Sequence, residues 1–300
     1  MFSISITGLK LLFIRLLKKT RIIRYVNFTI KRKYNGFTIR VPFITGMGLT
    51  NLVVQPDWFD SLIELFVQDQ SNSSFIDVGA NIGQTLIKIK TSKPNIRYLG
   101  FEPNVNCVFY VKKLIHINQF KNCEIINCAL TKLTGVFKLQ LSTIDDQRAS
   151  IISNFRPDYF TQKDIVLGID FDLFYSNQNT RIIKIDAEGA ELDIIRGMKE
   201  TIIKYNPIIF CEVLDYHNDE AGLYAKSRAK ELKNELDSLN YSIIKIIKEP
   251  KNNRIIQFTQ IDDFTLKQWT SDSLSSNDYM FTPSIRDKEI LTKLSLLTHN

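Results

Sequence analysis

The sequence predicts an α/β protein built around a doubly wound, largely parallel sheet. Short apolar runs of strand length alternate with longer runs of helix length from residue 74 to residue 260. This alternation is typical of βαβ units, in which helices cover both faces of a buried sheet. The first unit opens with Phe75-Ile-Asp-Val-Gly-Ala-Asn-Ile-Gly83, which reads as a strand, a glycine-dependent turn and the start of a helix. That opening is typical of domains that bind a nucleotide-like cofactor.

Length and composition suit one large domain with appendages. The chain has 300 residues, of which 44% are hydrophobic. Its net charge of +7 is unevenly distributed, because residues 1–56 carry ten Lys or Arg and no acidic residue. Residues 57–300 therefore hold 29 basic and 32 acidic side chains. Since the body is slightly acidic, the basic pI does not indicate nucleic-acid binding, and we predict no nucleic-acid partner.

Residues 8–26 are typical of a basic amphipathic helix. Their apolar core is too short for a membrane span or a signal sequence. Two interpretations stay open: peripheral contact with an anionic membrane surface or a partner, and packing on the domain with a solvated basic face. We predict a cytoplasmic location, at the inner face of the membrane if the first interpretation holds. The four cysteines form no zinc motif, which fits reduced thiols.

The elements follow in order along the chain. Asn35-Gly36 between alternating runs predicts a β-hairpin, and Trp58–Gln68 predicts a helix. Strands are predicted at 74–79, 97–102, 123–130, 181–186, 207–213, 242–247 and 255–260, and helices at 83–91, 105–118, 188–204, 223–239 and within 157–176. Because only residues 248–254 separate the last two strands, that pair is predicted to be an antiparallel hairpin.

These elements divide the chain into three parts. Residues 1–70 form an N-terminal extension of a basic helix and a β-hairpin. Residues 71–260 form the cofactor-binding domain. Residues 261–300 are rich in Ser and Asp, with one short amphipathic stretch at 285–297, and are predicted to be a C-terminal tail.

The turn after the first strand favours a cationic cofactor over a dinucleotide. A dinucleotide fingerprint needs a middle glycine so that the pyrophosphate can approach the backbone, and Asn81 occupies that position. Asp77 would also place negative charge beside the phosphates. A cofactor that carries an ammonium and a sulfonium suits Asp77 well. Glu102, at the end of the second strand, can accept both hydroxyls of a ribose, and the small residues around Ala129 leave a slot for an adenine ring.

Four segments resemble the FkbM-type S-adenosylmethionine-dependent methyltransferases, over about residues 45–260. They are Phe75-Ile-Asp77-Val-Gly79-Ala-Asn81-Ile-Gly83-Gln84, Gly100-Phe-Glu102-Pro-Asn104, Asn127-Cys-Ala129-Leu130 and Ile183-Lys184-Ile-Asp186-Ala-Glu188-Gly189-Ala-Glu191. The resemblance implies a Rossmann-like seven-stranded sheet in the order 3-2-1-4-5-7-6, with strand 7 antiparallel. It also implies S-adenosyl-L-methionine as the cofactor. The implied reaction is O-methylation of a carbohydrate, a glycoconjugate or a secondary metabolite.

The cofactor-binding residues predicted from these segments are Asp77, Gly79, Asn81, Gly83, Glu102, Ala129 and Asp186. Lys184 and Asp186 share a face by the period of a strand, so Asp186 and Glu188 are expected near the methyl end of the cofactor. Glu188 also has a simpler explanation, as does Glu191, because acidic residues in a first helical turn complement the helix dipole.

Methyl transfer to oxygen needs an aligned hydroxyl and a base that removes its proton. The candidate catalytic residues are Glu188, Glu212 and His217, and their order stays open. Asp145 and Asp146 with Glu188 and Glu212 could supply oxygen ligands for Mg²⁺. Because no local spacing enforces such a site, we predict no metal.

The acceptor is predicted to be a small molecule or a glycan, and residues 143–150 are a candidate substrate loop with Arg148 as a contact. Two other functions stay open. One is a non-catalytic S-adenosylmethionine-binding scaffold, which would bind the cofactor without consuming it. The other is an NAD-dependent oxidoreductase, which Asn81 and Asp77 disfavour.

Overall fold

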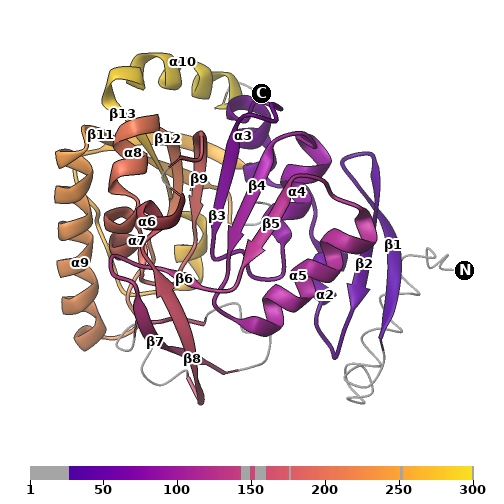
Figure 1. Cartoon of the computed structure of the whole chain (residues 1–300). Coiled ribbons are helices and arrows are strands. Elements are labelled where there is room, and N and C mark those ends of the chain that lie inside the picture. The colour runs from indigo at the N-terminus through magenta and orange to yellow at the C-terminus, as the bar shows by residue number, and fades with distance from the viewer. Residues whose placement is uncertain (1–26, 143–148, 153–159, 176, 251–252, 299–300) are drawn as a thin grey trace, which may run out of the picture.

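The computed structural model describes residues 27–142, 149–152, 160–175, 177–250 and 253–298. The predicted basic helix at 8–26 lies outside these residues, as do Asp145, Asp146 and Arg148. Within them, the centre of the molecule is an eight-stranded mixed sheet in the order β12-β11-β13-β10-β9-β3-β4-β5 (Figure 1). Helices pack on both faces of this sheet, as the alternating pattern of the sequence predicts.

Five strands of the large sheet are parallel to one another where they pair. They are β3 (Ser74–Val78), β4 (Arg97–Phe101), β5 (Cys123–Ile126), β9 (Thr180–Ile185) and β10 (Ile208–Glu212). The other strands are β11 (Tyr241–Lys248), β12 (Ile255–Ile261) and β13 (Asp278–Pro283). β13 runs antiparallel to both of its neighbours, β10 and β11.

The C-terminal part of the chain differs from the prediction. Residues 278–283 were expected in a tail, which is wrong, because they form β13 between β10 and β11. The predicted hairpin of β11 and β12 is confirmed, but β12 lies at the outer edge and the sheet has eight strands instead of seven. Tyr279 and Phe281 pack on one face of the sheet and Met280 on the other, so β13 is buried on both sides.

Two sets of helices cover the two faces. α3 (Trp58–Phe66), α4 (Gln84–Ser92), α5 (Val105–Asn118) and α10 (Asp287–Thr298) share one hydrophobic cluster with alternate residues of the strands. α7 (Glu191–Gly197), α8 (Lys199–Tyr205) and α9 (Asp219–Ser238) share the other. The single helix predicted at 188–204 is therefore two helices, which meet at Met198.

The N-terminal hairpin is confirmed. β1 (Phe28–Tyr34) and β2 (Phe37–Phe43) pair in register around Asn35 and Gly36, whose φ angles of 47° and 80° suit a two-residue hairpin turn. The Tyr34 hydroxyl donates to Asp60 of α3 at 2.9 Å. This hydrogen bond ties the N-terminal hairpin to α3. The short helix α2 (Leu49–Val53) lies between them in the chain, and the first strand of the large sheet follows α3.

A small sheet stands beside the carboxyl end of β5. It consists of β6 (Ala129–Leu130), β7 (Gly135–Leu141) and β8 (Gln162–Ile169), in the order β6-β8-β7. The helix predicted within 157–176 is confirmed as the short α6 (Phe171–Tyr175), whereas the described residues before it form β8, which pairs with β7 along seven residues. Lateral pairing with β7 outweighs the weak helical pattern of this segment.

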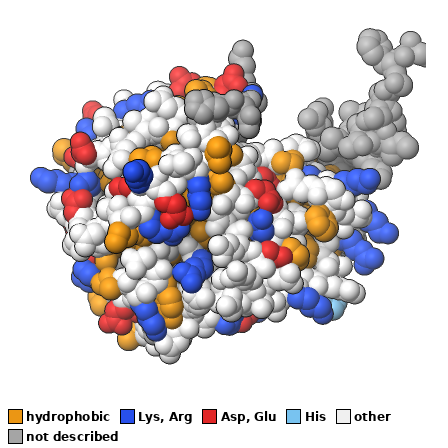
Figure 2. Space-filling model, turned by 90° about the horizontal axis from the view of Figure 1, so that it is seen from above, with side chains coloured by type: hydrophobic (Ala, Val, Ile, Leu, Met, Phe, Trp, Pro, Cys, Tyr) orange, Lys and Arg blue, Asp and Glu red, His pale blue; other side chains and the backbone are white. Residues whose placement is uncertain are grey.

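The surface seen from above carries mixed charges. Figure 2 shows acidic, basic and hydrophobic side chains interspersed over most of this face, with basic side chains gathered toward the edge that β1 and β2 form. Lys31, Lys33 and Arg40 of that hairpin are exposed. None of the helices in the described ranges has the length and apolar character needed to cross a bilayer.

Candidate active site

A row of charged side chains crosses the sheet at the carboxyl ends of the parallel strands. We call it the charged row: Asp77, Lys184, Glu212, Asp278 and Lys248, from the adjacent strands β3, β9, β10, β13 and β11. In the registers of these strands, Asp77 lies opposite Lys184 and Glu212 lies opposite Asp278. Because side chains alternate along a strand, all five face the side that α3 and α4 cover.

Asp77 lies beneath the site and not in it. Its side chain is fully buried and accepts a hydrogen bond from the Tyr98 hydroxyl at 2.5 Å. Burial raises the pKa of this carboxyl, and the nearby Lys184 partly offsets that effect. Since Asp77 lines neither of the two cavities described below, the prediction that it contacts the cofactor directly is not supported. It supports the turn from below.

The turn of residues 79–83 depends on left-handed backbone conformations. Gly79 has a φ of 81°, and a Cβ added there would lie 1.9 Å from the carbonyl oxygen of Asp186. Asn81 has a φ of 45°, and its side-chain Oδ1 accepts from the backbone N–H of Ile82 at 2.7 Å. Gly83, also left-handed, caps α4 and lines neither cavity, so its role is to shape the turn.

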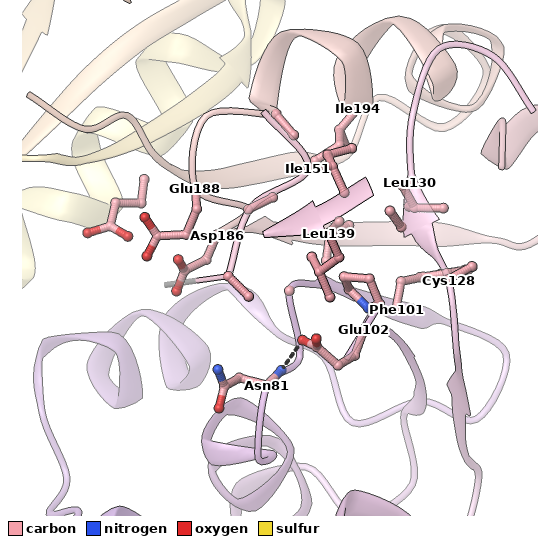
Figure 3. A pocket seen from close by; sticks show the side chains of 18 of the residues that line it. Asn81, Phe101, Glu102, Cys128, Leu130, Leu139, Ile151, Asp186, Glu188 and Ile194 are labelled. Carbon is pink, nitrogen blue, oxygen red and sulfur yellow. Dashed lines mark hydrogen bonds between the residues drawn. The ribbon is translucent and has the colours of Figure 1, made fainter. Parts of the chain in front are cut away.

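Glu102 is held in place by the backbone. Its two carboxylate oxygens accept hydrogen bonds from the N–H groups of Asn81 and Asn104, each at 2.8 Å, and Figure 3 shows the first of these. Burial raises the pKa of Glu102 to about 7, against the effect of these two donors. The side chain is thus fixed in one orientation while each oxygen keeps a second acceptor position.

The first cavity lies at the carboxyl ends of β3, β4 and β9 and has a volume of about 270 Å³. Figure 3 shows that its two ends differ in character. One end is apolar and is lined by Phe101, Cys128, Leu130, Leu139 and Ile151, with Ala129 beside them. At the other end Asp186 and Glu188 lie close together.

Charge in the first cavity has one sign. Its described lining contains the carboxylates of Glu102, Asp186, Glu188 and Glu212, and no Lys or Arg. Such a lining repels a pyrophosphate and attracts a cationic ligand. The structure therefore brings together six of the predicted cofactor and catalytic residues in addition to Gly79: Asn81, Glu102, Ala129, Asp186, Glu188 and Glu212.

The acidic end follows directly after β9. Glu188 has a φ of 53°, unusual for a residue with a long side chain, and such backbone strain concentrates at functional sites. Its carbonyl accepts from the Ser150 hydroxyl at 2.7 Å, which joins the predicted substrate loop to the site. Glu191 instead accepts from the Gly189 N–H at 2.8 Å and lies outside both cavities, so it closes the turn.

The pKa values of Glu212 and Lys184 are strongly shifted. Burial raises the pKa of Glu212 well above its usual range, and the carboxylates of Asp186 and Asp278 raise it further. Burial disfavours the charge of Lys184, but Asp186 and Asp77 outweigh it and raise the pKa of this amine. Lys184 donates to Asp186 at 3.0 Å, which confirms that these two side chains share a face.

A second cavity, of about 430 Å³, lies over the charged row. It shares Gly79, Asn81, Gln84, Asp186 and Glu212 with the first cavity, so the two adjoin at the turn and at the ends of β9 and β10. Sequence reasoning missed the rest of its polar wall, which comes from elements far apart in the chain: Asp57, Trp58, Lys88, Lys248, Ser271, Ser275 and Asp278. The tertiary fold brings these residues together, so no local motif in the sequence marks them.

His217 is separate from this arrangement. It follows β10 but lines neither cavity, and its ring lies 5.7 Å from the ring of Trp269. The structure therefore does not bring His217 to Glu188 and Glu212. Within the described ranges, no group of three or more His, Cys, Asp or Glu side chains is placed to hold a metal ion.

A doubly wound sheet with a cavity at its carboxyl edge is the arrangement of α/β domains that bind a nucleotide-like cofactor. The model of the methyltransferase FkbM domain matches residues 77–243, which is more than half of the chain. The chain belongs to the FkbM methyltransferase family. A search of curated protein sequences found no significant match.

Matches to solved methyltransferase structures have low sequence identity. An FkbM methyltransferase from Methylobacillus flagellatus is 15% identical, with a TM-score of 0.42, and the match covers 72% of this chain and 44% of that one. Precorrin-6y C5,15-methyltransferase from Geobacter metallireducens is 11% identical, with a TM-score of 0.36 and coverage of 74% and 85%. P. horikoshii TYW2 in complex with MeSAdo is 11% identical, with a TM-score of 0.36 and coverage of 85% and 72%. The chain thus matches less than half the length of the first of these proteins.

Proposed function

We propose that the protein is an O-methyltransferase that uses S-adenosylmethionine to methylate a hydroxyl group of a carbohydrate, a glycoconjugate or a related metabolite. The observation that carries the cofactor assignment is the lining of the first cavity, which presents four carboxylates and no cation among the described residues. A phosphate-bearing dinucleotide would be repelled by that lining, whereas a ligand with a sulfonium and an ammonium is attracted to it.

The first cavity suits this cofactor in one orientation, because each part of the cavity matches a different part of the molecule. The apolar end at Cys128 and Leu130 suits an adenine ring. Glu102, already oriented by two backbone amides, suits the two hydroxyls of a ribose. The acidic end at Asp186 and Glu188 then suits the cationic groups. When bound, S-adenosylmethionine would supply an electrophilic methyl group on its sulfonium.

The residues at the acidic end have different proposed roles in the reaction. Glu188, set by its left-handed backbone at the wall of the first cavity, is the base that we propose for the hydroxyl proton. Glu212, whose pKa is raised by burial and by neighbouring carboxylates, is the better suited of the two to hold a proton and to donate a hydrogen bond to the acceptor. Lys184 holds Asp186 in place at 3.0 Å.

Calorimetry with S-adenosylmethionine and with NAD⁺ tests the cofactor assignment. We expect binding of the first and none of the second, and absence of S-adenosylmethionine binding would sink the proposal. Transfer of a labelled methyl group to a glycan or metabolite extract, followed by mass spectrometry, tests the reaction. Cofactor binding without transfer to any acceptor would support a non-catalytic scaffold instead.

Glu188→Gln separates catalysis from binding. Because a general base contributes about 10²- to 10⁴-fold to the rate, we expect kcat to fall by about that factor. Affinity for S-adenosylmethionine should fall by a smaller factor than kcat, because the amide keeps the size of the side chain and Asp186 keeps a carboxylate at this end of the cavity. A variant with undiminished kcat would exclude Glu188 as the base.

A further inference from the structure

The second cavity adjoins the acidic end of the first cavity, where the methyl group of the cofactor would lie under the proposed function. The two share Gly79, Asp186 and Glu212, and the second extends from them over the charged row toward α3. Its volume of about 430 Å³ lies within the range of about 300–1,000 Å³ that is typical of ligand sites. It is therefore large enough and correctly placed for a second substrate.

We propose that the second cavity is the acceptor site and that it takes an uncharged, hydroxyl-rich ring, such as a neutral sugar unit. This assignment rests on the proposed function, because the methyl group must pass from the cofactor in the first cavity to an acceptor in the second at the place where the two cavities adjoin. It adds the location of the acceptor, the residues that contact it and the charge that it carries.

Charge pairing in the second cavity argues against an anionic acceptor. Each of its three lysines is already paired with carboxylates. Lys88 lies 2.5 Å from Asp57 and 2.9 Å from Asp60, Lys184 lies 3.0 Å from Asp186, and Lys248 pairs with Asp278. The described lining therefore offers no surplus cation to neutralise an acid.

The same lining is rich in groups that bind hydroxyls. Carboxylates of the charged row can accept from hydroxyl groups, and their paired lysines can donate to hydroxyl oxygens. Ser271, Ser275 and Gln84 add neutral donors and acceptors along the wall. A ring with several hydroxyls can satisfy such a surface without a net charge, and a charged ligand would have to disrupt buried ion pairs, which is costly.

Trp58 supplies a flat surface to the wall of the second cavity. It begins α3, directly after Asp57, whose side chain caps the helix by accepting from the Phe59 N–H at 2.9 Å. The Trp58 ring is partly exposed and lies under the Lys248 amine, which is 4.9 Å from its centroid. Because the cap and this contact fix the ring, it is a preformed apolar face for the C–H side of a sugar ring.

The walls of the two cavities come from different parts of the chain. The lining of the first cavity lies within the family match at 77–243. Trp58, Lys248, Leu274 and Asp278 of the second lie outside it. Acceptor choice would therefore be set by the segments before and after the matched domain, which meet over the charged row.

The fluorescence of Trp58 tests the assignment directly. The chain has two tryptophans, so Trp269→Phe leaves Trp58 as the only one. The full-length variant is titrated, with S-adenosylhomocysteine present, with methyl glycosides of neutral hexoses and 6-deoxyhexoses, and with methyl glucuronoside as the acidic counterpart. We expect a saturable change in emission with at least one neutral glycoside and binding of the glucuronoside about tenfold weaker, a difference of about 1.4 kcal/mol.

A matched pair of variants in the same background locates the response. Ser275→Phe fills the second cavity and should abolish the response, while Ser276→Phe, one residue outside the lining, should keep it. Neither should change the Kd of S-adenosylmethionine more than about twofold. No saturable response to any neutral glycoside, or tighter binding of the glucuronoside, overturns the assignment. Glycoside binding in a protein that fails to bind S-adenosylmethionine would sink the proposed function and leave the pocket assignment standing.

Discussion

The two adjoining cavities are built in opposite ways. The first is assembled mainly from short segments that follow strands, and its key side chain, Glu102, is held by backbone amides of its own turn and the neighbouring one. The second is walled by ion pairs whose members come from the start of α3, from α4 and from the strands β9, β11 and β13 or the residue after β9. Local motifs therefore determine the first cavity, the cofactor half of the site under our proposal, and long-range contacts determine the second, the acceptor half.

The largest effect is expected where the two cavities share a wall. Gly79→Ala would place a methyl group against the Asp186 carbonyl in a left-handed conformation, which we expect to cost about 4 kcal/mol of unfolding free energy. Both ligands should lose affinity, because Asp186 lines both cavities.

Gly36→Ala is the matched control for that variant. Gly36 has a similar φ of 80°, but nothing lies within 4 Å of an added Cβ, so only the backbone cost of about 1 kcal/mol remains. Urea denaturation of the two variants measures the difference. Equal losses would show that the contact with Asp186 is unimportant.

A smaller effect, confined to the cofactor half, is expected from Glu102→Ala. Loss of two hydrogen bonds to a charged acceptor should weaken S-adenosylmethionine binding about 100-fold, or about 3 kcal/mol. The control is Glu124→Ala, an exposed strand residue that pairs with Arg97 at 2.6 Å and should leave the Kd within about twofold. Calorimetry measures the Kd of S-adenosylmethionine for both variants. Similar values would show that Glu102 does not contact the cofactor.

Glu191→Gln should change the free energy of unfolding and leave the affinities for both ligands unchanged. Burial raises the pKa of Glu191 to about 7, above the value of about 4.3 expected in the unfolded chain. Between these values the folded protein holds a proton that the unfolded chain lacks, so stability falls as pH rises, and above pH 7 the full cost is present.

The glutamine variant keeps the bond from the Gly189 N–H and removes this titration. We expect it to gain about 1–2 kcal/mol over the wild type at pH 8 and nothing at pH 4, as urea denaturation across this range would measure. An equal gain at both pH values would contradict the titration of Glu191.

The smallest effect is expected from His217→Ala. Since His217 lines neither cavity, kcat should fall by less than about threefold, against the 10²- to 10⁴-fold loss typical of a missing base. Steady-state kinetics once an acceptor is identified provides the measurement. A loss of the larger size would return His217 to the reaction and make the loop after β10 part of the active site.

Most of the polar residues that line the first cavity could be predicted from the sequence because their signals are local. Gly79, Asn81 and Glu102 follow strand ends that the apolar runs already define, and strand ends of a parallel sheet meet at one edge. The sequence predicts that Asp77 contacts the cofactor, because it does not show that the Asp77 carboxylate is buried beneath the cavities and bonded to the Tyr98 hydroxyl of the neighbouring strand.

The acceptor half was missed for a physical reason. Asp278 and Lys248 become neighbours of Glu212 only because β13 inserts between β10 and β11, and nothing near residue 278 specifies that pairing. The alternation of Asp278-Tyr-Met-Phe-Thr does indicate a strand, but the Ser- and Asp-rich residues before it obscured the signal. Trp58 was assigned to a helix correctly, but the sequence does not show that its ring lies against Lys248 in the wall of the second cavity.

The position of β13 also has a consequence for synthesis of the protein. The nascent chain can form β3, β4, β5, β9 and β10 as they leave the ribosome, but the gap between β10 and β11 stays open until residue 283 has emerged. The edges of β10 and β11 are exposed to unintended pairing during that interval. The cofactor half can thus be complete before the acceptor half exists, and chaperone dependence should be greatest late in translation.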